Sequence, residues 1–447
     1  MNQYQSQTEI LSSRKYFIIR STDEHTQPEE ANRPIVKYIV LLIHIVMKLI
    51  RGLTPVFKQG LWMVFLLLVR FADAFWRKDD KLVVVSEIGG DGLYSGNSRF
   101  LFEYLKKHEN DGVRVVWLTT DRDLIREMSQ KIEFIDSFQH FLSLEGIRIA
   151  LRCSCCITSG TRLKPFKSNR KARCLRIMLW HGIPIKTIGR CEKRRSLKSL
   201  IEYRNIARSF DLWTVCSQEE AQKVSICTGM PKERIIVTGY PRNDMLVQTE
   251  DGLFDGNSKS ENQKTILYAP TWRPPGELKW FPFTDFEPDE LSAFLKKHNA
   301  NLLIRGHYRN DILDEEADRT NVFFNENIKP ADRDTYPDVQ ELLPKIDILI
   351  SDYSGIFLDF LLTDRPMIFI PYDLDKYRDE RGIMYDYDEI TPGPKVNSFK
   401  EMLTALEDYL NDPEKDSELR IVVKHRFHDV IDGKSCQRIM EIIDNRA

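Results

Sequence analysis

The sequence lacks an excess of charge of either sign, a long uninterrupted apolar run and a repeated or low-complexity segment. Its 447 residues include 65 basic and 67 acidic side chains, which give a formal net charge of -2. Proteins that bind nucleic acid usually carry a basic excess, so this balance excludes that class. Any site for an anion must therefore be a local feature of the chain.

Cysteine is sparse, with eight residues in the chain and one dense group at Cys153, Cys155 and Cys156. This group lies in a mostly apolar stretch, and no second cysteine pair stands at a spacing that zinc sites use. We therefore expect reduced thiols that are mostly buried in a strand, a cytosolic protein, and no metal site.

A secretory signal is also missing, because residues 1–34 form a polar tail of mixed charge, and we expect the protein to stay inside the cell. Two apolar runs follow between residues 35 and 79, but Lys48, Arg70 and Asp73 interrupt or flank them. A membrane span needs about 20 apolar residues. The pattern predicts membrane-associating amphipathic helices on an anionic surface, with a buried helical pair, a hairpin dipping into the bilayer and a true span as alternatives.

From residue 80 the pattern changes to short β-branched runs that alternate with amphipathic stretches, which is typical of parallel sheets with crossover helices. The predicted strands of the first half cover 82–85, 113–118, 154–158, 175–180, 212–216 and 235–237. We assign residues 80–248 to a first Rossmann-like domain. Ser217 follows one of these strands and is expected to cap a helix.

Residues 249–264 are polar and turn-forming, and we interpret them as an interdomain linker. The predicted strands that follow cover 265–268, 301–304, 322–325, 346–350 and 366–370, with helices expected from Asp289, Val339 and Gly355. Residues 265–447 then form a second Rossmann-like domain with C-terminal helices. The predicted fold class is α/β, with two such domains facing a cleft.

Unusual polar residues follow four of the predicted strands, where ligands of open parallel sheets bind. They are Trp180-His181-Gly182, the segment 269–273, Arg305-Gly306-His307, and Ser351-Asp352-Tyr353-Ser354. Each has an ordinary structural explanation when taken alone. Together they indicate a site in the cleft.

The segment 345–362, KIDILISDYSGIFLDFLL, runs from an apolar strand through a short polar turn into a predicted helix. Backbone amides at Ser354 and Gly355 and the positive end of the helix dipole are suited to a diphosphate. Ser351 and Ser354 add hydroxyl donors. Asp359 could accept from ribose hydroxyls, although a solvated helix carboxylate is the alternative.

Several motifs resemble, in order and spacing, the CDP-glycerol glycerophosphotransferases, a family that includes teichoic acid primases and polymerases. The likeness covers most of residues 82–443. It rests on GNSR at 96–99, LWHGIPIKTIG at 179–189, TGYPRND at 238–244, LYAPTWR at 267–273, Arg305-x-His307, SDYSG at 351–355, RPMIFIPYDLDKYRDERG at 365–382, Asp386-Tyr387, Pro392-Gly393-Pro394 and Asp432-Gly433-Lys434. Two positions depart from the family pattern, since Ile183 replaces its usual Thr and Gly355 its usual second Ser.

The resemblance implies a GT-B-like architecture, in which the C-terminal domain (265–447) binds the CDP-alditol and the N-terminal domain (80–248) receives the acceptor. It implies catalytic roles for His181 and His307. The substrate-binding residues expected from the resemblance and the motifs are Thr271, Arg273, Arg305, Ser351, Asp352, Ser354, Gly355 and Asp359, with Lys186, Arg242 and Arg378 as further sources of positive charge.

The implied reaction is attack of an acceptor hydroxyl on the β-phosphorus of CDP-glycerol, with release of CMP. We expect His181 to act as the base, because imidazole titrates near neutrality, and His307 to contact the diphosphate or assist departure of CMP. Purely structural histidines are the alternative. No motif requires a cofactor, and Mg²⁺ would be loosely held or carried by the substrate.

The expected partners are CDP-glycerol, a lipid-linked saccharide or polymer acceptor and the membrane surface, at the cytoplasmic face of the cell membrane. The association is expected to be peripheral or monotopic. A CDP-ribitol ribitolphosphotransferase, a GT-B glycosyltransferase using a sugar nucleotide, and a non-catalytic membrane-bound scaffold are the alternatives. Primase against polymerase activity, the acceptor and the oligomeric state stay open, because fold does not settle substrate.

Overall fold

The computed structural model describes Ile45 and residues 78–87, 93–109, 113–134, 136–160, 174–193, 197–247, 263–271, 273, 278–306, 324–333 and 335–446. The predicted polar tail, nearly all of the predicted membrane-associating segment and the predicted linker up to residue 262 lie outside these residues. Within the described part of the chain, no helix is both long enough and apolar enough to cross a membrane.

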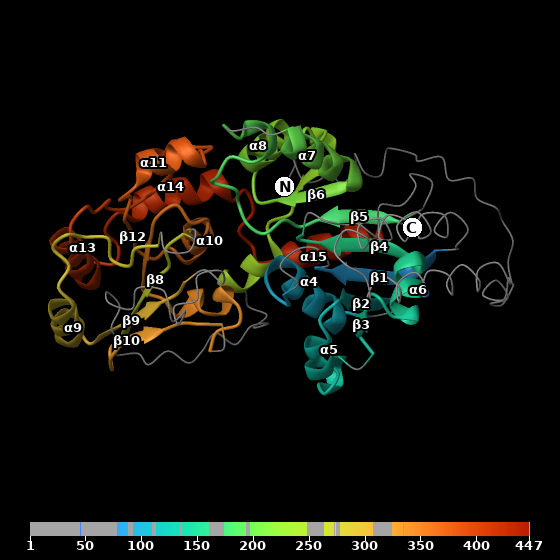
Figure 1. Cartoon of the computed structure of the whole chain (residues 1–447), viewed down its shortest axis with the longest axis horizontal. Helices are drawn as coiled ribbons and strands as arrows, with labels where there is room; N and C mark the ends of the chain where they lie inside the picture. The colour runs from blue at the N-terminus through green and yellow to red at the C-terminus, as the bar shows by residue number, and fades with distance from the viewer. Residues whose placement is uncertain are drawn as a thin grey trace, which may run out of the picture.

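The first sheet contains seven described strands in the order β3-β2-β1-β4-β5-β6-β7, and its neighbouring strands pair in parallel. The strands are β1 (Asp79–Ser86), β2 (Arg114–Thr119), β3 (Phe138–His140), β4 (Cys153–Thr158), β5 (Leu175–Met178), β6 (Leu212–Val215) and β7 (Ile235–Val237). The helices are α4 (Gly96–Lys107), α5 (Arg122–Met128), α6 (Leu144–Arg152), α7 (Leu197–Ser209) and α8 (Gln218–Thr228). This domain occupies the right half of Figure 1.

The second sheet contains five described strands in the order β10-β9-β8-β11-β12, again parallel. They are β8 (Lys264–Tyr268), β9 (Ala300–Ile304), β10 (Ile328–Pro330), β11 (Ile348–Ser351) and β12 (Met367–Phe369). The helices are α9 (Pro288–Lys297), α10 (Ile356–Phe360), α11 (Leu374–Glu380), α12 (Tyr387–Ile390), α13 (Phe399–Asn411), α14 (Ser417–Phe427) and α15 (Ser435–Asp444). The predicted α/β fold with two parallel sheets is confirmed.

Local chemistry explains where several helices begin. The side chain of Ser217 accepts a hydrogen bond from the Glu220 amide at the start of α8, as predicted, and Gly229 ends this helix in the left-handed region with φ of 75°. Asp121 and Ser143 cap α5 and α6 in the same way. Each such N-cap contributes about 1 kcal/mol.

Two predicted elements of the second domain differ in the structure. The strand expected at 322–325 is wrong in its described part, because Phe324 and Asn325 lie in a loop and the strand that pairs with β9 is β10. Asn325 accepts from the amides of Asn327 and Ile328, which forms a turn at this point. The helix expected from Val339 is only a pair of 3-10 turns, η7 (Val339–Glu341) and η8 (Leu343–Lys345), since Pro344 cannot continue an α-helix.

The end of the chain returns to the first domain. Helix α14 packs on the second domain through Val423 and Phe427. Helix α15 buries Cys436, Ile439 and Ile443 among the apolar residues of β1, β2 and α4, and lies beside α4 in Figure 1. The predicted second domain, residues 265–447, therefore includes a helix that packs in the core of the first domain.

Cysteines are buried as expected, with one difference. Six of them are free and buried in the structure, but Cys191 and Cys227 form a disulfide with a Cα–Cα distance of 5.2 Å. The prediction of reduced thiols is therefore wrong for this pair. The cysteines come from separate elements, the turn before α7 and the end of α8, so sequence spacing gave no sign of it.

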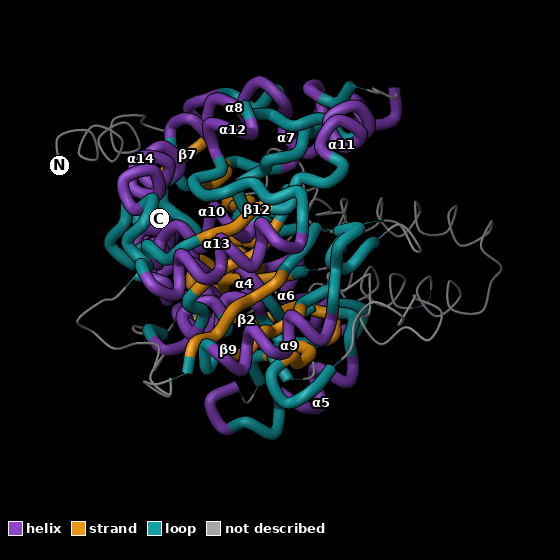
Figure 2. Tube along the Cα trace, turned by 90° about the vertical axis from the view of Figure 1, so that its left-hand side faces the viewer, coloured by secondary structure: helices purple, strands orange, loops and turns teal. Residues whose placement is uncertain are grey.

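The two domains meet along a segment that follows β5. Ile183 and Ile185 are buried in the core of the second domain, and the backbone from Ile185 to Thr187 pairs with that of 382–384 through Met384 N to Ile185 O at 2.8 Å and Thr187 N to Gly382 O at 3.2 Å. In the view of Figure 2, α8 and α7 of the first domain lie with α12 and α11 of the second towards the top of the molecule.

Candidate active site

The loop after β5 carries His181 at the boundary between the two domains. Trp180 is 3% exposed, has φ of 57°, and packs its indole 5.0 Å from the ring of Trp213. His181 is exposed and its ring centroid lies 4.3 Å from that of Trp180. The buried tryptophan thus anchors a turn that presents the imidazole to solvent.

This turn lies against the polar turn that follows β11. A Cβ atom added to Gly355 would lie 3.2 Å from the carbonyl oxygen of Ile183. Ser354 and Gly355 are partly exposed and directly precede α10. The structure therefore brings the backbones of the His181 loop and the SDYSG turn together, as expected of two strand ends facing one cleft.

Asp352 and Ser351 hold the strand ends of the second sheet together. The Asp352 carboxylate is 2% exposed and accepts from the amide and the hydroxyl of Thr271 at 2.7 and 2.6 Å. Ser351 donates its hydroxyl to the Ala269 carbonyl at 2.8 Å. Burial raises the pKa of Asp352, and the nearby Arg273 opposes this shift. These side chains form the floor beneath the SDYSG turn.

Arg273 is enclosed by acidic and aromatic side chains. Its guanidinium donates to Asp373 at 2.9 Å and to Asp352 at 3.3 Å, and its Cζ lies 4.9 Å from the ring centroid of Tyr377 and 5.4 Å from that of Tyr353. Burial alone would lower the pKa of Arg273, but the carboxylates raise it. Two carboxylates thus compensate the charge that was expected to bind the donor.

Lys186 differs from Arg273 because no described carboxylate forms an ion pair with it. Within the described part of the chain, its ammonium makes no hydrogen bond or ion pair, and Nζ lies 5.8 Å from the ring centroid of Tyr377. Burial, as the largest cause, lowers the pKa of Lys186 to about 8; Asp352 opposes this shift, and Arg273 and Arg381 contribute to it. A half-buried cation between the domains is suited to a diphosphate.

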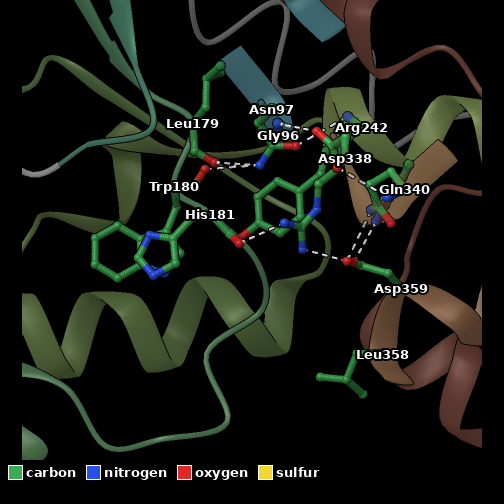
Figure 3. A network of polar contacts seen from close by, with 12 residues as sticks. Gly96, Asn97, Leu179, Trp180, His181, Arg242, Asp338, Gln340, Leu358 and Asp359 are labelled. Atoms are coloured by element: carbon green, nitrogen blue, oxygen red, sulfur yellow. Dashed lines mark hydrogen bonds and ion pairs between the residues drawn. The ribbon is translucent and has the colours of Figure 1, made fainter. Parts of the chain in front are cut away.

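Arg242 and Asp359 were expected to contact substrate, and the structure pairs them with each other across the domain boundary (Figure 3). Asp359 is 2% exposed and also accepts from Asn243 at 3.0 Å and Gln340 at 3.2 Å. Arg242 donates from Nη1 to the carbonyl oxygen of His181 at 2.8 Å. Protein groups therefore occupy both carboxylate oxygens, and a ribose hydroxyl would have to displace one of them.

The remaining predicted cations have structural partners or lie at the rim. Arg305 donates from Nη1 to the carbonyls of Ala331 at 3.0 Å and Tyr336 at 2.8 Å, which braces the loop after β10. Burial lowers the pKa of Arg305. The side chain of Arg378 is 39% exposed on α11. His307 lies outside the described residues.

Sequence patterns did not single out several residues that shape the site. Asn97 and Asn243 lie inside quoted motifs, but their partners are backbone carbonyls or residues distant in sequence. Gln340 gave no sequence signal. Among the described residues, no group of three or more His, Cys, Asp or Glu side chains is arranged to hold a metal ion, and the metal requirement of the reaction stays a prediction.

Comparisons with known proteins agree with the motifs. The sequence profile described as CDP-Glycerol:Poly(glycerophosphate) glycerophosphotransferase matches residues 68–445. The chain is 27% identical to the teichoic acid glycerol-phosphate transferase of Staphylococcus aureus over 368 residues, and this match covers 78% of this chain and 90% of that protein. It is also 27% identical over 376 residues to the teichoic acid poly(ribitol-phosphate) polymerase of Bacillus spizizenii, covering 82% of this chain and 56% of the polymerase.

A solved structure supports the fold. The structure of the wall teichoic acid polymerase TagF superposes with a TM-score of 0.69 at 23% sequence identity, covering 92% of this chain and 98% of the TagF chain. At this identity the likeness concerns the arrangement of the two domains.

Proposed function

Because the chain belongs to the CDP-glycerol:poly(glycerophosphate) glycerophosphotransferase family, we propose that it transfers glycerol phosphate from CDP-glycerol to a membrane-bound, lipid-linked acceptor in the synthesis of teichoic acid or a related envelope polymer. The acceptor oxygen forms a bond to the β-phosphorus while the bond from that phosphorus to the bridging oxygen breaks. The bond electrons leave with CMP, and the acceptor hydroxyl loses its proton to a base.

His181 is the proposed base, and its position is the observation that carries the proposal. It is an exposed imidazole on a loop whose next residues touch the SDYSG turn through Ile183 and Gly355. A base must lie within reach of the hydroxyl that attacks the bound donor. A histidine of the acceptor domain beside a donor turn meets this requirement.

The donor diphosphate is proposed to lie at Ser354, Gly355 and Lys186. Lys186 offers three ammonium hydrogens with no hydrogen-bond acceptor among the described residues, and Ser354 adds a partly exposed hydroxyl. Thr271, Ser351, Asp352 and Arg273 support this turn from below through the contacts described above. His307 keeps its proposed role as a ligand of the diphosphate.

The proposed place of action is the cytoplasmic face of the cell membrane. Nucleotide-activated donors are available in the cytosol, and the apolar runs between residues 35 and 79 carry interspersed basic residues such as Lys48 that suit an anionic surface. A lipid-linked acceptor would reach the cleft from this surface. CDP-ribitol is the competing donor, since the polymerase of Bacillus spizizenii named above is a poly(ribitol-phosphate) polymerase.

The test is CMP release by the full chain in detergent, with CDP-glycerol, with and without a synthetic lipid-linked disaccharide. We expect release that depends on the acceptor and falls by at least about 100-fold in His181→Ala. His298→Ala is the matched control, because His298 is a helix-terminal histidine of the second domain that packs on Phe294. Release from CDP-ribitol or a sugar nucleotide in place of CDP-glycerol would refute the donor assignment.

A further inference from the structure

The turn that carries His181 has a backbone that two side chains hold in place. Trp180 has φ of 57°, which is a costly conformation for a bulky residue, and Gly182 has φ of 138°. Asn97 donates from Nδ2 to the Trp180 carbonyl at 3.0 Å, and Arg242 donates to the next carbonyl, that of His181. Strained backbone persists only where the surroundings over-determine it.

The guanidinium of Arg242 also lies close to Gly182. A Cβ atom at Gly182 would come within 2.7 Å of its Nη2, and the φ of 138° is one that residues with a side chain rarely adopt, which favours glycine at this position. The backbone amide of Arg242 donates to Asn97 Oδ1 at 3.2 Å. The side chain of Asn97 is therefore bonded both to the turn and to the backbone of Arg242.

The same guanidinium reaches into the second domain. Arg242 belongs to η5 (Pro241–Leu246) of the first domain and pairs with Asp359 of α10, the helix that follows the SDYSG turn. Figure 3 shows Arg242 between the His181 carbonyl and Asp359. Asp359 is fixed in turn by Asn243 and Gln340. One residue thus links the turn of the proposed base to the helix behind the proposed donor site.

We propose that Arg242 is a positioning residue that sets the His181 imidazole against the donor turn, and that its ion pair with Asp359 makes this position depend on contact between the two domains. The inference rests on the proposed role of His181. A phosphate ligand would need positive charge that is not already compensated, whereas Asp359 is a buried carboxylate on this guanidinium. We therefore replace the predicted substrate contact of Arg242 with a structural link to the base.

The test measures kcat, KM for CDP-glycerol and the pH profile in the CMP-release assay with the full chain. Arg242→Ala leaves Asp359 buried without its partner, so the double variant R242A/D359N, which removes both charges, is measured beside it. A small displacement of a reacting group costs about 100-fold in rate, and we expect that loss in kcat for both variants. KM for CDP-glycerol is expected to stay within about threefold of the starting value.

Chemical rescue separates positioning from a general structural role. Added guanidinium should occupy the space between Asp359 and the His181 carbonyl and restore at least about tenfold of kcat in Arg242→Ala, whereas methylammonium should not. Arg242→Lys should behave like Arg242→Ala, because one ammonium cannot reproduce the fork of a guanidinium. Rescue should be weaker in the double variant, which lacks the carboxylate.

Arg438→Ala is the matched control. Its side chain is 14% exposed against 15% for Arg242, and it likewise contacts one carbonyl, that of Thr238, and one aspartate, Asp432. We expect kcat within about threefold and no rescue by guanidinium, as for a substitution away from the site.

Two results would overturn the inference: a kcat of Arg242→Ala within threefold of the parent, whether or not KM rises, or failure of guanidinium to act on a folded variant. Each result is interpreted only together with the activities of the parent protein and of His181→Ala. If the parent releases no CMP from CDP-glycerol, or if His181→Ala is as active as the parent, the proposed function fails instead.

Discussion

The charge of Lys186 is expected to lower the stability of the fold and to contribute to binding of the donor. The variant Lys186→Met removes a half-buried ammonium that has no hydrogen-bond acceptor in the described part of the chain, while keeping a side chain of similar length. Because burial lowers the pKa of Lys186 to about 8, holding the charged form costs the folded protein free energy. We expect the variant to be more stable than the parent and much less active.

The size of this effect follows from the pKa. The difference between the ordinary value of 10.5 and about 8 corresponds to about 3.5 kcal/mol at about 1.4 kcal/mol per pH unit. Since the unfolded chain still holds the proton between pH 8 and 10.5 and the folded chain has released it, stability of the parent rises with pH in this window. The advantage of Lys186→Met is therefore full at pH 7 and disappears towards pH 10.5.

Activity should move in the opposite direction. A lost charge-assisted contact with the diphosphate costs about 1.5–3 kcal/mol, or about 10- to 100-fold in kcat/KM. In the parent, kcat/KM for CDP-glycerol should fall as pH rises through about 8, because this ratio reports groups of the free enzyme. Lys186→Arg, which stays charged, should lose this fall.

Thermal unfolding from pH 6 to 10 and CMP-release kinetics over the same range provide the assay. Lys223→Met is the control, because its ammonium also lies over a tyrosine ring, 5.1 Å from the centroid of Tyr385, but donates to the Met384 carbonyl at 3.1 Å. Lys223→Met should gain no stability and keep its affinity for CDP-glycerol. A Lys186→Met variant less stable than the parent at pH 7, or a fall at pH 8 that persists in Lys186→Arg, would refute the reasoning.

Three other changes give further tests. Burial raises the pKa of Glu220 to about 7, so the free energy of unfolding falls as pH rises from 4.5 towards 7. Above pH 7, thermal unfolding should find Glu220→Gln more stable than the parent by up to about 3.5 kcal/mol; an equal difference at pH 5 would contradict this. Gly355→Ala places a methyl group 3.2 Å from the Ile183 carbonyl and should lower kcat by about tenfold in the CMP-release assay, with little change in melting temperature. In denaturant without reductant, mass spectrometry should find six alkylated cysteines and none at Cys191 or Cys227; reduction should cost about 2–4 kcal/mol of stability.

The class of fold and the positions of most strands along the chain followed from the alternation of apolar runs. Val83, Val84 and Val85 are at most 1% exposed, and a β-branched run of this kind is typical of a central parallel strand. Helix α7 and the short edge strand β3 were not predicted, because neither has a clear period. The packing of α15 on the first domain depends on contacts with residues about 340 positions away, such as Phe100.

The strand-end rule named residues that the structure brings together, but it did not show which of their charged groups are already paired. The His181 loop and the SDYSG turn do come together through Ile183 and Gly355, and Lys186 interacts electrostatically with Asp352 of that turn. The sequence does not distinguish Arg273 and Arg242 from Lys186, since each is a cation near a strand end. Only the structure shows that Asp373 and Asp359 already compensate those two charges, because these partners come from distant segments.

The return of α15 to the first domain has a consequence for synthesis on the ribosome. The core around β1, β2 and α4 includes Cys436, Ile439 and Ile443, so this domain cannot complete its packing when its own strands have emerged. At about 5–20 residues per second, the interval between β7 and α15 lasts about 10–40 s. During that interval the apolar residues of β1, β2 and α4 that α15 later contacts lack this cover, and the second domain can fold before the first is finished.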